Sequence, residues 1–136
     1  MDLKKYLSKS EIKKIVEDLM IRGFEKDDLK FRVNRAIRFF NSLPQNISLY
    51  RIISLSDISD FNKKIMGDHW TINKTKLLDS YLFLKDRKYF LIKAIGSSSN
   101  IILPEGFALN IEYPNEEEIL IRDNLKFVSI DELKTQ

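Results

Sequence analysis

Cysteine is absent from this sequence, and histidine and tryptophan occur once each. The lack of cysteine excludes disulfide bonds, thiolate zinc sites and cysteine nucleophiles, and a single histidine argues against a transition-metal site. No apolar run approaches the roughly 20 residues that cross a membrane, and the first residues lack the apolar segment of a signal peptide. We therefore expect a cytoplasmic protein that uses neither a metal nor a membrane.

Length and charge set wider limits on the fold and on the partners. A chain of 136 residues fits one domain, 1–136, and 43% hydrophobic with 32% charged residues is typical of globular proteins. Residues 1–100 carry 20 Lys and Arg against 12 Asp and Glu, whereas residues 101–136 carry 3 against 8. The basic part is compatible with nucleic-acid binding, but its cations form no run and equally suit a solvated surface that accepts a small anion.

A pair of helices is predicted over residues 1–44. Ser8 and Glu11 have the spacing of a capping box, and apolar residues then recur at helical spacing up to the stop signal of Gly23. A second stripe of the same kind follows and ends before Pro44. The first third of the chain is therefore expected to be helical.

The remaining residues, 45–136, are predicted to form a β-rich part. The expected strands are 47–53, 69–72, 89–95, 101–103, 107–111, 116–121 and 125–130, with one further helix at 73–84. Helices followed by a meander of short strands indicate an α+β fold.

Arg51 interrupts the apolar face of the first strand, because it is in phase with Ile47 and Leu49. An unpaired guanidinium group would cost several kcal/mol on a covered face, so we expect it to meet a carboxylate or a ligand anion such as a diphosphate. The alternative is an edge strand in which Arg51 lies at the rim and pairs with a surface acid.

Glu116 and Glu118 are two residues apart, which places both carboxylates on one face of a strand, roughly 7 Å from each other. Such a pair suits acid–base work or the stabilisation of a cationic transition state. Glu117 is expected to face the other way. The alternative is that these residues are solvated as the chain enters a strand after the turn at Pro114, since an isolated Glu-x-Glu is a weak motif.

The only histidine and the only tryptophan are adjacent, in His69-Trp70-Thr71. Trp70 is expected in the core because indole carries a large apolar surface. Alternation along a strand then leaves His69 and Thr71 together on the opposite face, where both can hydrogen-bond a ligand or a carboxylate.

These motifs occur in a fixed order along residues 47–130 that resembles the Arg, Ser-x-Ser, Glu-x-Glu series of the mono-ADP-ribosyltransferase family. The segments that carry the resemblance are Leu49-Tyr50-Arg51, His69-Trp70-Thr71 and Glu116-Glu117-Glu118-Ile119-Leu120-Ile121, with Leu125-Lys126-Phe127 behind. The resemblance implies two small packed, mainly antiparallel β-sheets after the helical pair. It also implies that residues 45–136 bind NAD, as a co-substrate, in a cleft between the sheets.

The resemblance assigns roles to the matching residues. It implies that Arg51 pairs with the phosphates of NAD, that Glu118 stabilises the cation formed as nicotinamide leaves, and that Glu116 positions or deprotonates the acceptor. Tyr50, His69, Trp70 and Thr71 fall at NAD-binding positions. Because His69-Trp70-Thr71 replaces Ser-x-Ser, the task of orienting the catalytic glutamate would pass to His69. The aromatic candidates for stacking on nicotinamide are Tyr81, Phe83 and Phe90.

The implied activity is transfer of ADP-ribose from NAD to a macromolecule, with an arginine on a protein expected in preference to a nucleic acid. The acidic residues of 101–136 would then attract a cationic acceptor. A phage or toxin-like effector of this kind would act in the cytoplasm of a host. The alternatives are an NAD-dependent RNA 2′-phosphotransferase, an enzyme that ADP-ribosylates nucleic acid, and a non-enzymatic nucleic-acid or protein adaptor.

Overall fold

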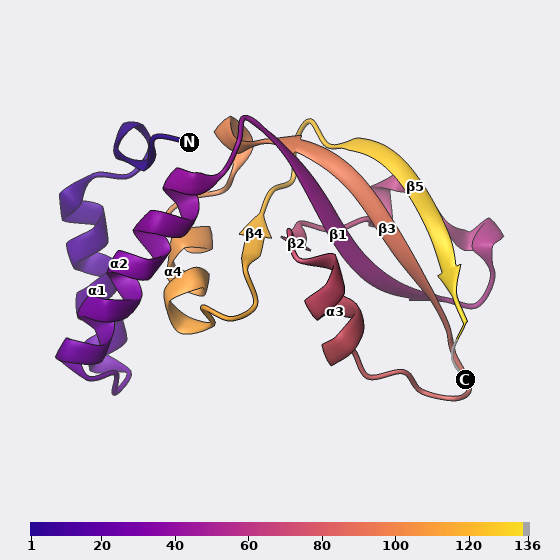
Figure 1. The fold of residues 1–136 in the computed structure, drawn as a ribbon, viewed down its shortest axis with the longest axis horizontal. Coiled ribbons are helices and arrows are strands. Elements are labelled where there is room, and N and C mark those ends of the chain that lie inside the picture. Colours follow the sequence, from indigo (N-terminus) through magenta and orange to yellow (C-terminus); the bar gives the residue numbers. More distant parts are fainter. Residues whose placement is uncertain (135–136) are drawn as a thin grey trace.

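The computed structural model describes residues 1–134, apart from the side chain at position 65 (Figure 1). The helices are α1 (Lys9–Ile21), α2 (Lys26–Ser42), α3 (Lys74–Ser80) and α4 (Glu105–Glu112). The strands are β1 (Asn46–Leu55), β2 (His69–Thr71), β3 (Lys88–Ser97), β4 (Glu118–Leu120) and β5 (Lys126–Leu133). The predicted α+β class is confirmed.

The N-terminal helices begin and end where the sequence signals predict. The Ser8 amide donates to Glu11 Oε1 at 2.9 Å and the Glu11 amide donates to Ser8 Oγ at 3.2 Å, so the capping box is confirmed. After α1 the chain turns at Gly23, whose φ of 103° favours glycine. No helix within residues 1–134 combines the length and the apolar character that a membrane span requires.

The segment predicted as a strand at 107–111 is a helix, α4. Its apolar residues alternate as in a strand, but Phe107 and Ile111 are also one helical turn apart, and both are fully buried. This helix packs directly against β4, and a Cβ added at Gly106 would lie in ordinary van der Waals contact with Cβ of Leu120, at 3.5 Å. The strand predicted at 101–103 is reduced to one isolated bridge, between Ile101 and Ile121.

The strands form one antiparallel sheet in the order β4-β2-β1-β3-β5, so the prediction of two packed sheets is wrong. β1 and β3 pair along ten residues each, whereas β1 and β2 pair only at Tyr50 and Thr71. Because one residue pair connects its two parts, the sheet consists of a long three-stranded part (β1, β3, β5) and a short two-stranded part (β2, β4). The two parts remain connected through this pair and form a single sheet.

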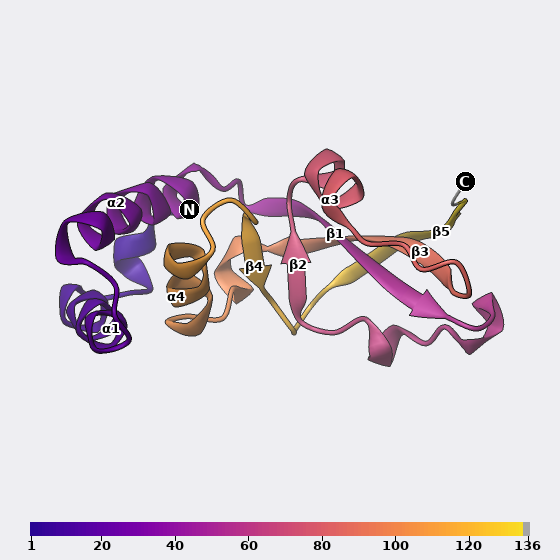
Figure 2. The same ribbon diagram turned by 90° about the horizontal axis from the view of Figure 1, so that it is seen from below.

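Two apolar clusters hold the helices to the sheet. The larger one contains Trp70, only 1% exposed, and joins α1, α2 and α4 to one end of the sheet (Figures 1 and 2). The predicted core position of Trp70 is thus confirmed. The smaller cluster lies on the opposite face, where Leu77 and Leu78 of α3 pack near Ile52 and Leu91. The join between β1 and β2 therefore lies between these two clusters.

Two phenylalanines on α2 provide a matched test of this core. Phe40 is fully buried beside Phe107, whereas Phe31 is 62% exposed. Phe40→Ala should lower the free energy of unfolding by about 3–5 kcal/mol, because it leaves a cavity. Phe31→Ala should change it by less than about 0.5 kcal/mol. Urea denaturation followed by circular dichroism measures both, and equal losses would contradict this account of the core.

Candidate functional site

A pocket of about 410 Å³ opens at the join between β1 and β2. β1, β2 and α3 contribute to its wall, together with the chain entering β4. The structure brings all seven site residues predicted from the sequence to this wall, which are Tyr50, Arg51, His69, Trp70, Thr71, Glu116 and Glu118. Residues from three segments far apart in the sequence therefore meet in one place.

Within the pocket, His69 contacts Glu118. The antiparallel register sets Thr71 opposite Glu118 and His69 opposite Leu120, so His69 and Glu118 project from the same face of the sheet. His69 Nδ1 lies 2.5 Å from Glu118 Oε1, a distance at which an Nδ1–H donates to the carboxylate. The Glu118 side chain is 20% exposed and that of His69 is 50% exposed. Glu118 is thus fixed in orientation while it remains open to the pocket.

The other ring nitrogen of His69 faces a second carboxylate, that of Asp68. His69 Nε2 lies 3.6 Å from Asp68 Oδ1, and Arg122 Nη2 donates to Asp68 Oδ2 at 2.9 Å. The hydrogen bond from Arg122 lowers the pKa of Asp68, and the nearby His69 lowers it further. A row of basic and acidic groups in alternation therefore leads from the surface to the pocket. In order, its members are Arg122, Asp68, His69 and Glu118.

Glu116 reaches the pocket by a route that strand alternation does not predict. β4 begins only at Glu118, and Glu117 has a φ of 48°, in the left-handed region. The Thr71 hydroxyl donates to the Glu116 carbonyl at 3.0 Å and accepts from the Asn73 amide at 3.2 Å. The predicted strand from 116 to 121 is therefore wrong at its start, and a turn held by Thr71 places Glu116 at the pocket.

The side chain of Arg51 lies on the other face of the sheet from the His69 ring and the Glu118 carboxylate. Tyr50 is opposite Thr71, so the side chain of Arg51 leaves the other face of the sheet. Its Nη1 donates to the His69 carbonyl at 2.9 Å, and its Cζ lies 2.9 Å from where a Cβ on Gly67 would be. None of the ion pairs found within residues 1–134 includes Arg51. Among the described residues, Arg51 thus meets a backbone carbonyl and no carboxylate, while its pairing with a ligand anion stays a prediction.

α3 adds residues to the pocket that the sequence analysis did not assign to it. Lys76 and Ser80 line the wall one helical turn apart, and Lys76 Nζ donates to the carbonyl of Asn115. Tyr81 also lines the pocket, with its ring centroid 5.5 Å from that of Phe83. The polar stripe of Lys76 and Ser80, next to the apolar stripe of this helix, is the signal that could have identified them.

Of the three aromatic candidates for stacking on nicotinamide, Tyr81 alone lines the pocket. Phe83 packs behind it, with its ring edge-on to Tyr89. Phe90 is 2% exposed and pairs with Ile53 in the sheet. Of these three rings, Tyr81 is therefore the one that a ligand in the pocket can reach.

No protein-family model matches this chain, and comparisons with curated proteins and with solved structures find no match either. The functional argument therefore depends on the pocket itself. Within the part of the chain that the structure describes, no three His, Asp or Glu side chains are placed to hold a metal ion. The groups available for chemistry are the two glutamates, the histidine and the lysine of the pocket wall.

The contact between Arg122 and Asp68 predicts how Asp68 titrates. The folded-state pKa of Asp68 lies below its ordinary value of 3.8, so this contact stabilises the fold above that value and the stabilisation is lost as the pH falls through the folded-state pKa. In a carboxyl-detected NMR titration, Arg122→Ala should raise the midpoint of Asp68. Arg22→Ala, which removes a similar surface pair with Glu112, should leave that midpoint unchanged. An Asp68 midpoint insensitive to Arg122→Ala would contradict the assignment.

Proposed function

We propose that this protein is a mono-ADP-ribosyltransferase that transfers ADP-ribose from NAD to a macromolecular acceptor and releases nicotinamide. One observation carries the proposal: the three segments of the motif series lie on three neighbouring strands, β1, β2 and β4, and line one pocket. If the three segments were unrelated, nothing would require β1, β2 and β4 to be neighbours in the sheet. The contact of His69 with Glu118 adds support, because it supplies the orienting partner expected where the motif departs from Ser-x-Ser.

The pocket has features that suit a dinucleotide. Its volume lies within the usual range of roughly 300–1,000 Å³ for small-molecule sites. Lys76 provides a cation for the diphosphate, and the ring of Tyr81 provides a flat surface for nicotinamide. We assign the diphosphate to Lys76, because the guanidinium group of Arg51 is held on the other face by the His69 carbonyl. In this proposal Arg51 supports the backbone of β2.

The two glutamates divide the chemistry. NAD supplies a ribose that bears a good leaving group and gains positive charge as the bond to nicotinamide weakens. Glu118, held by His69, presents a fixed carboxylate to that charge and needs no reorientation during the reaction. Glu116 is more exposed and lies nearer the entrance, where it accepts a proton from the acceptor. His69 is a positioning residue in this scheme.

Two neighbouring glutamates allow a direct test. Glu118→Gln should lower the rate of nicotinamide release by on the order of 10²–10³, because it removes the charge that faces the reacting ribose. Glu117→Gln makes the same chemical change one residue away, at a side chain outside the pocket wall, and should retain most of the wild-type rate. Release of nicotinamide from labelled NAD measures both variants. Equal rates for Glu118→Gln and the wild type would contradict the proposed function.

A further inference from the structure

We propose that the acceptor is a single-stranded nucleic acid, bound over a surface that leads from α2 to the pocket. This inference rests on the proposed ADP-ribosyl transfer and names the acceptor for it. The surface, called here the α2–α3 surface, consists of Phe31, Arg35, Arg38, Lys74, Lys76 and Tyr113. It carries four cations and two exposed aromatic rings.

Two of these cations converge on one residue at the pocket entrance. Arg35 of α2 donates through Nη2 to Asn115 Oδ1 at 3.1 Å, and Lys76 of α3 donates to the Asn115 carbonyl. Both acceptors are neutral, so the two positive charges are not compensated there. Asn115 immediately precedes Glu116, and the cations therefore lie next to the proposed proton acceptor.

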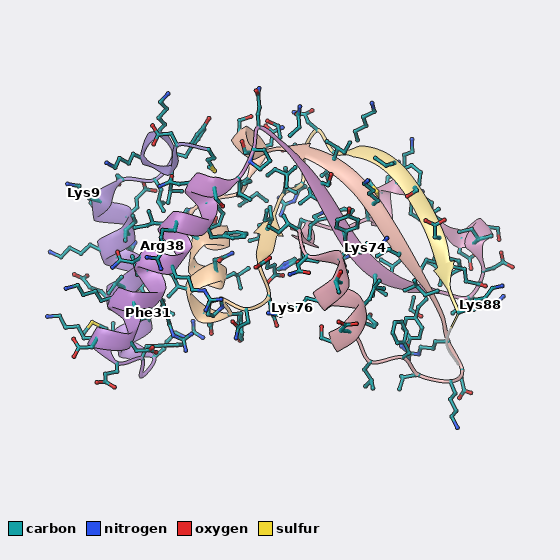
Figure 3. The ribbon with its side chains drawn as sticks, in the orientation of Figure 1. Lys9, Phe31, Arg38, Lys74, Lys76 and Lys88 are labelled. Atoms are coloured by element: carbon teal, nitrogen blue, oxygen red, sulfur yellow. The ribbon has the colours of Figure 1, made fainter. Side chains whose placement is uncertain are left out.

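The other cations extend this positive charge on both sides of β4. Figure 3 shows Arg38 on α2 and Lys74 and Lys76 on α3, to either side of that strand. No ion pair among the described residues includes any of the four cations. Because Lys76 is assigned to the diphosphate of NAD, a polyanion that crosses the entrance can contact the other three cations without breaking an existing pair.

Some of the nearby acidic residues are already neutralised. Glu112 at the end of α4 pairs with Arg22, and Asp28 of α2 pairs with Arg32 at 2.8 Å. Four other acids on these segments, Asp27, Asp79, Glu116 and Glu117, belong to no ion pair among the described residues. The positive charge is therefore most concentrated where Arg35 and Lys76 meet at Asn115.

The aromatic rings suit a nucleic acid better than a simple anion. Phe31 is 62% exposed and lies one helical turn before Arg35, while Tyr113 is 48% exposed and lies two residues before Asn115. Surfaces that bind single strands combine cations for the phosphates with aromatic side chains on which bases stack. Because unpaired bases expose their flat faces, a single strand fits this surface better than a duplex.

The same surface disfavours an arginine on a protein as the acceptor. A second guanidinium group at the entrance would face Arg35 and Lys76 at close range, and like charges repel. The acidic residues of 101–136 are divided between two places. Asp131 and Glu132 lie on β5, the edge strand farthest from β4 in the sheet, whereas Glu116 and Glu118 line the pocket. Because the proposed reaction already uses these two glutamates, we assign the binding of the acceptor to the cations and aromatic rings of the α2–α3 surface.

The transfer step can be written with every bond, electron pair and proton accounted for. A nucleophilic oxygen or nitrogen of the nucleotide forms a bond to C1′ of the ribose as the bond between that carbon and nicotinamide breaks. The electrons of the broken bond leave with nicotinamide, which departs as a neutral molecule. Glu116 accepts the proton of the nucleophile, and no oxidant or reductant is needed.

The test uses the full chain, labelled NAD, and single-stranded RNA and DNA oligonucleotides of about 20 nucleotides. Fluorescence anisotropy measures binding, and the label found on the oligonucleotide measures transfer. Three neutralised phosphates predict that affinity falls about 20-fold between about 50 and 200 mM salt, with a slope of about −0.7 per phosphate. Nicotinamide release in the same samples reports NAD consumption separately.

Matched charge reversals locate the binding surface. Arg35→Glu with Arg38→Glu should weaken oligonucleotide binding at least about tenfold and reduce transfer to the oligonucleotide. Lys9→Glu with Lys88→Glu makes the same change in net charge at the two ends of the molecule, away from β4 (Figure 3), and should retain both. Phe31→Ala should also weaken binding, and its unfolding curve shows whether its fold is intact.

Each outcome bears on one level of the proposal. The inference is supported if the protein binds and labels the oligonucleotide in a salt-dependent way. Both properties should be lost in the Arg35 and Arg38 double variant and kept in the Lys9 and Lys88 control. NAD consumption with label on protein arginines, or with hydrolysis alone, would overturn the nucleic-acid acceptor while leaving ADP-ribosyl transfer in place. Oligonucleotide binding without any NAD consumption would overturn the proposed function and the acceptor assignment with it. A double variant that binds as the wild type does would overturn the surface.

Discussion

The pairing of Tyr50 with Thr71 is the one contact of the β1–β2 register through which the two parts of the sheet are connected. On one side of this pair, β1 continues along β3, and on the other, β2 continues along β4. Since β1 and β2 separate after a single pair, backbone and side chains along the separation remain available to line a pocket. The location of the site therefore follows from an incomplete strand pairing in an otherwise regular antiparallel sheet.

Thr71 takes part in this join and also in the geometry of the site. Its backbone belongs to the pair with Tyr50, its neighbour in β4 is Glu118, and its hydroxyl bonds to the Glu116 carbonyl. The sequence motif suggests that this hydroxyl binds a ligand, whereas in the structure it holds the turn before β4. The distance between the two carboxylates thus depends on Thr71, which bonds to the main chain of one glutamate and lies beside the other.

Local signals in the sequence predict much of this fold, and non-local contacts account for most of the errors. The Ser8 cap could be predicted because it depends on residues close in sequence, and the burial of Trp70 could be predicted because indole carries a large apolar surface. Phe107 and Ile111 fit both a strand and a helix, and only their packing against the rest of the core selects the helix. The single sheet could not be predicted, because alternation reveals which residues share a face but not which strands are neighbours.

For the site, too, the sequence predicts which residues come together but not all of their contacts. His69 and Glu118 could be found from their motifs, since strand alternation places them correctly. Alternation also predicted that Arg51 shares a face of β1 with Ile47 and Leu49, but its partner there, the His69 carbonyl, depends on a contact between strands that the sequence does not reveal. That contact has a consequence for Gly67, where an added Cβ would lie 2.9 Å from the guanidinium carbon. Any larger residue at Gly67 would displace the group that anchors the main chain of His69, so the contact between His69 and Glu118 depends on a position, Gly67, that has no side chain.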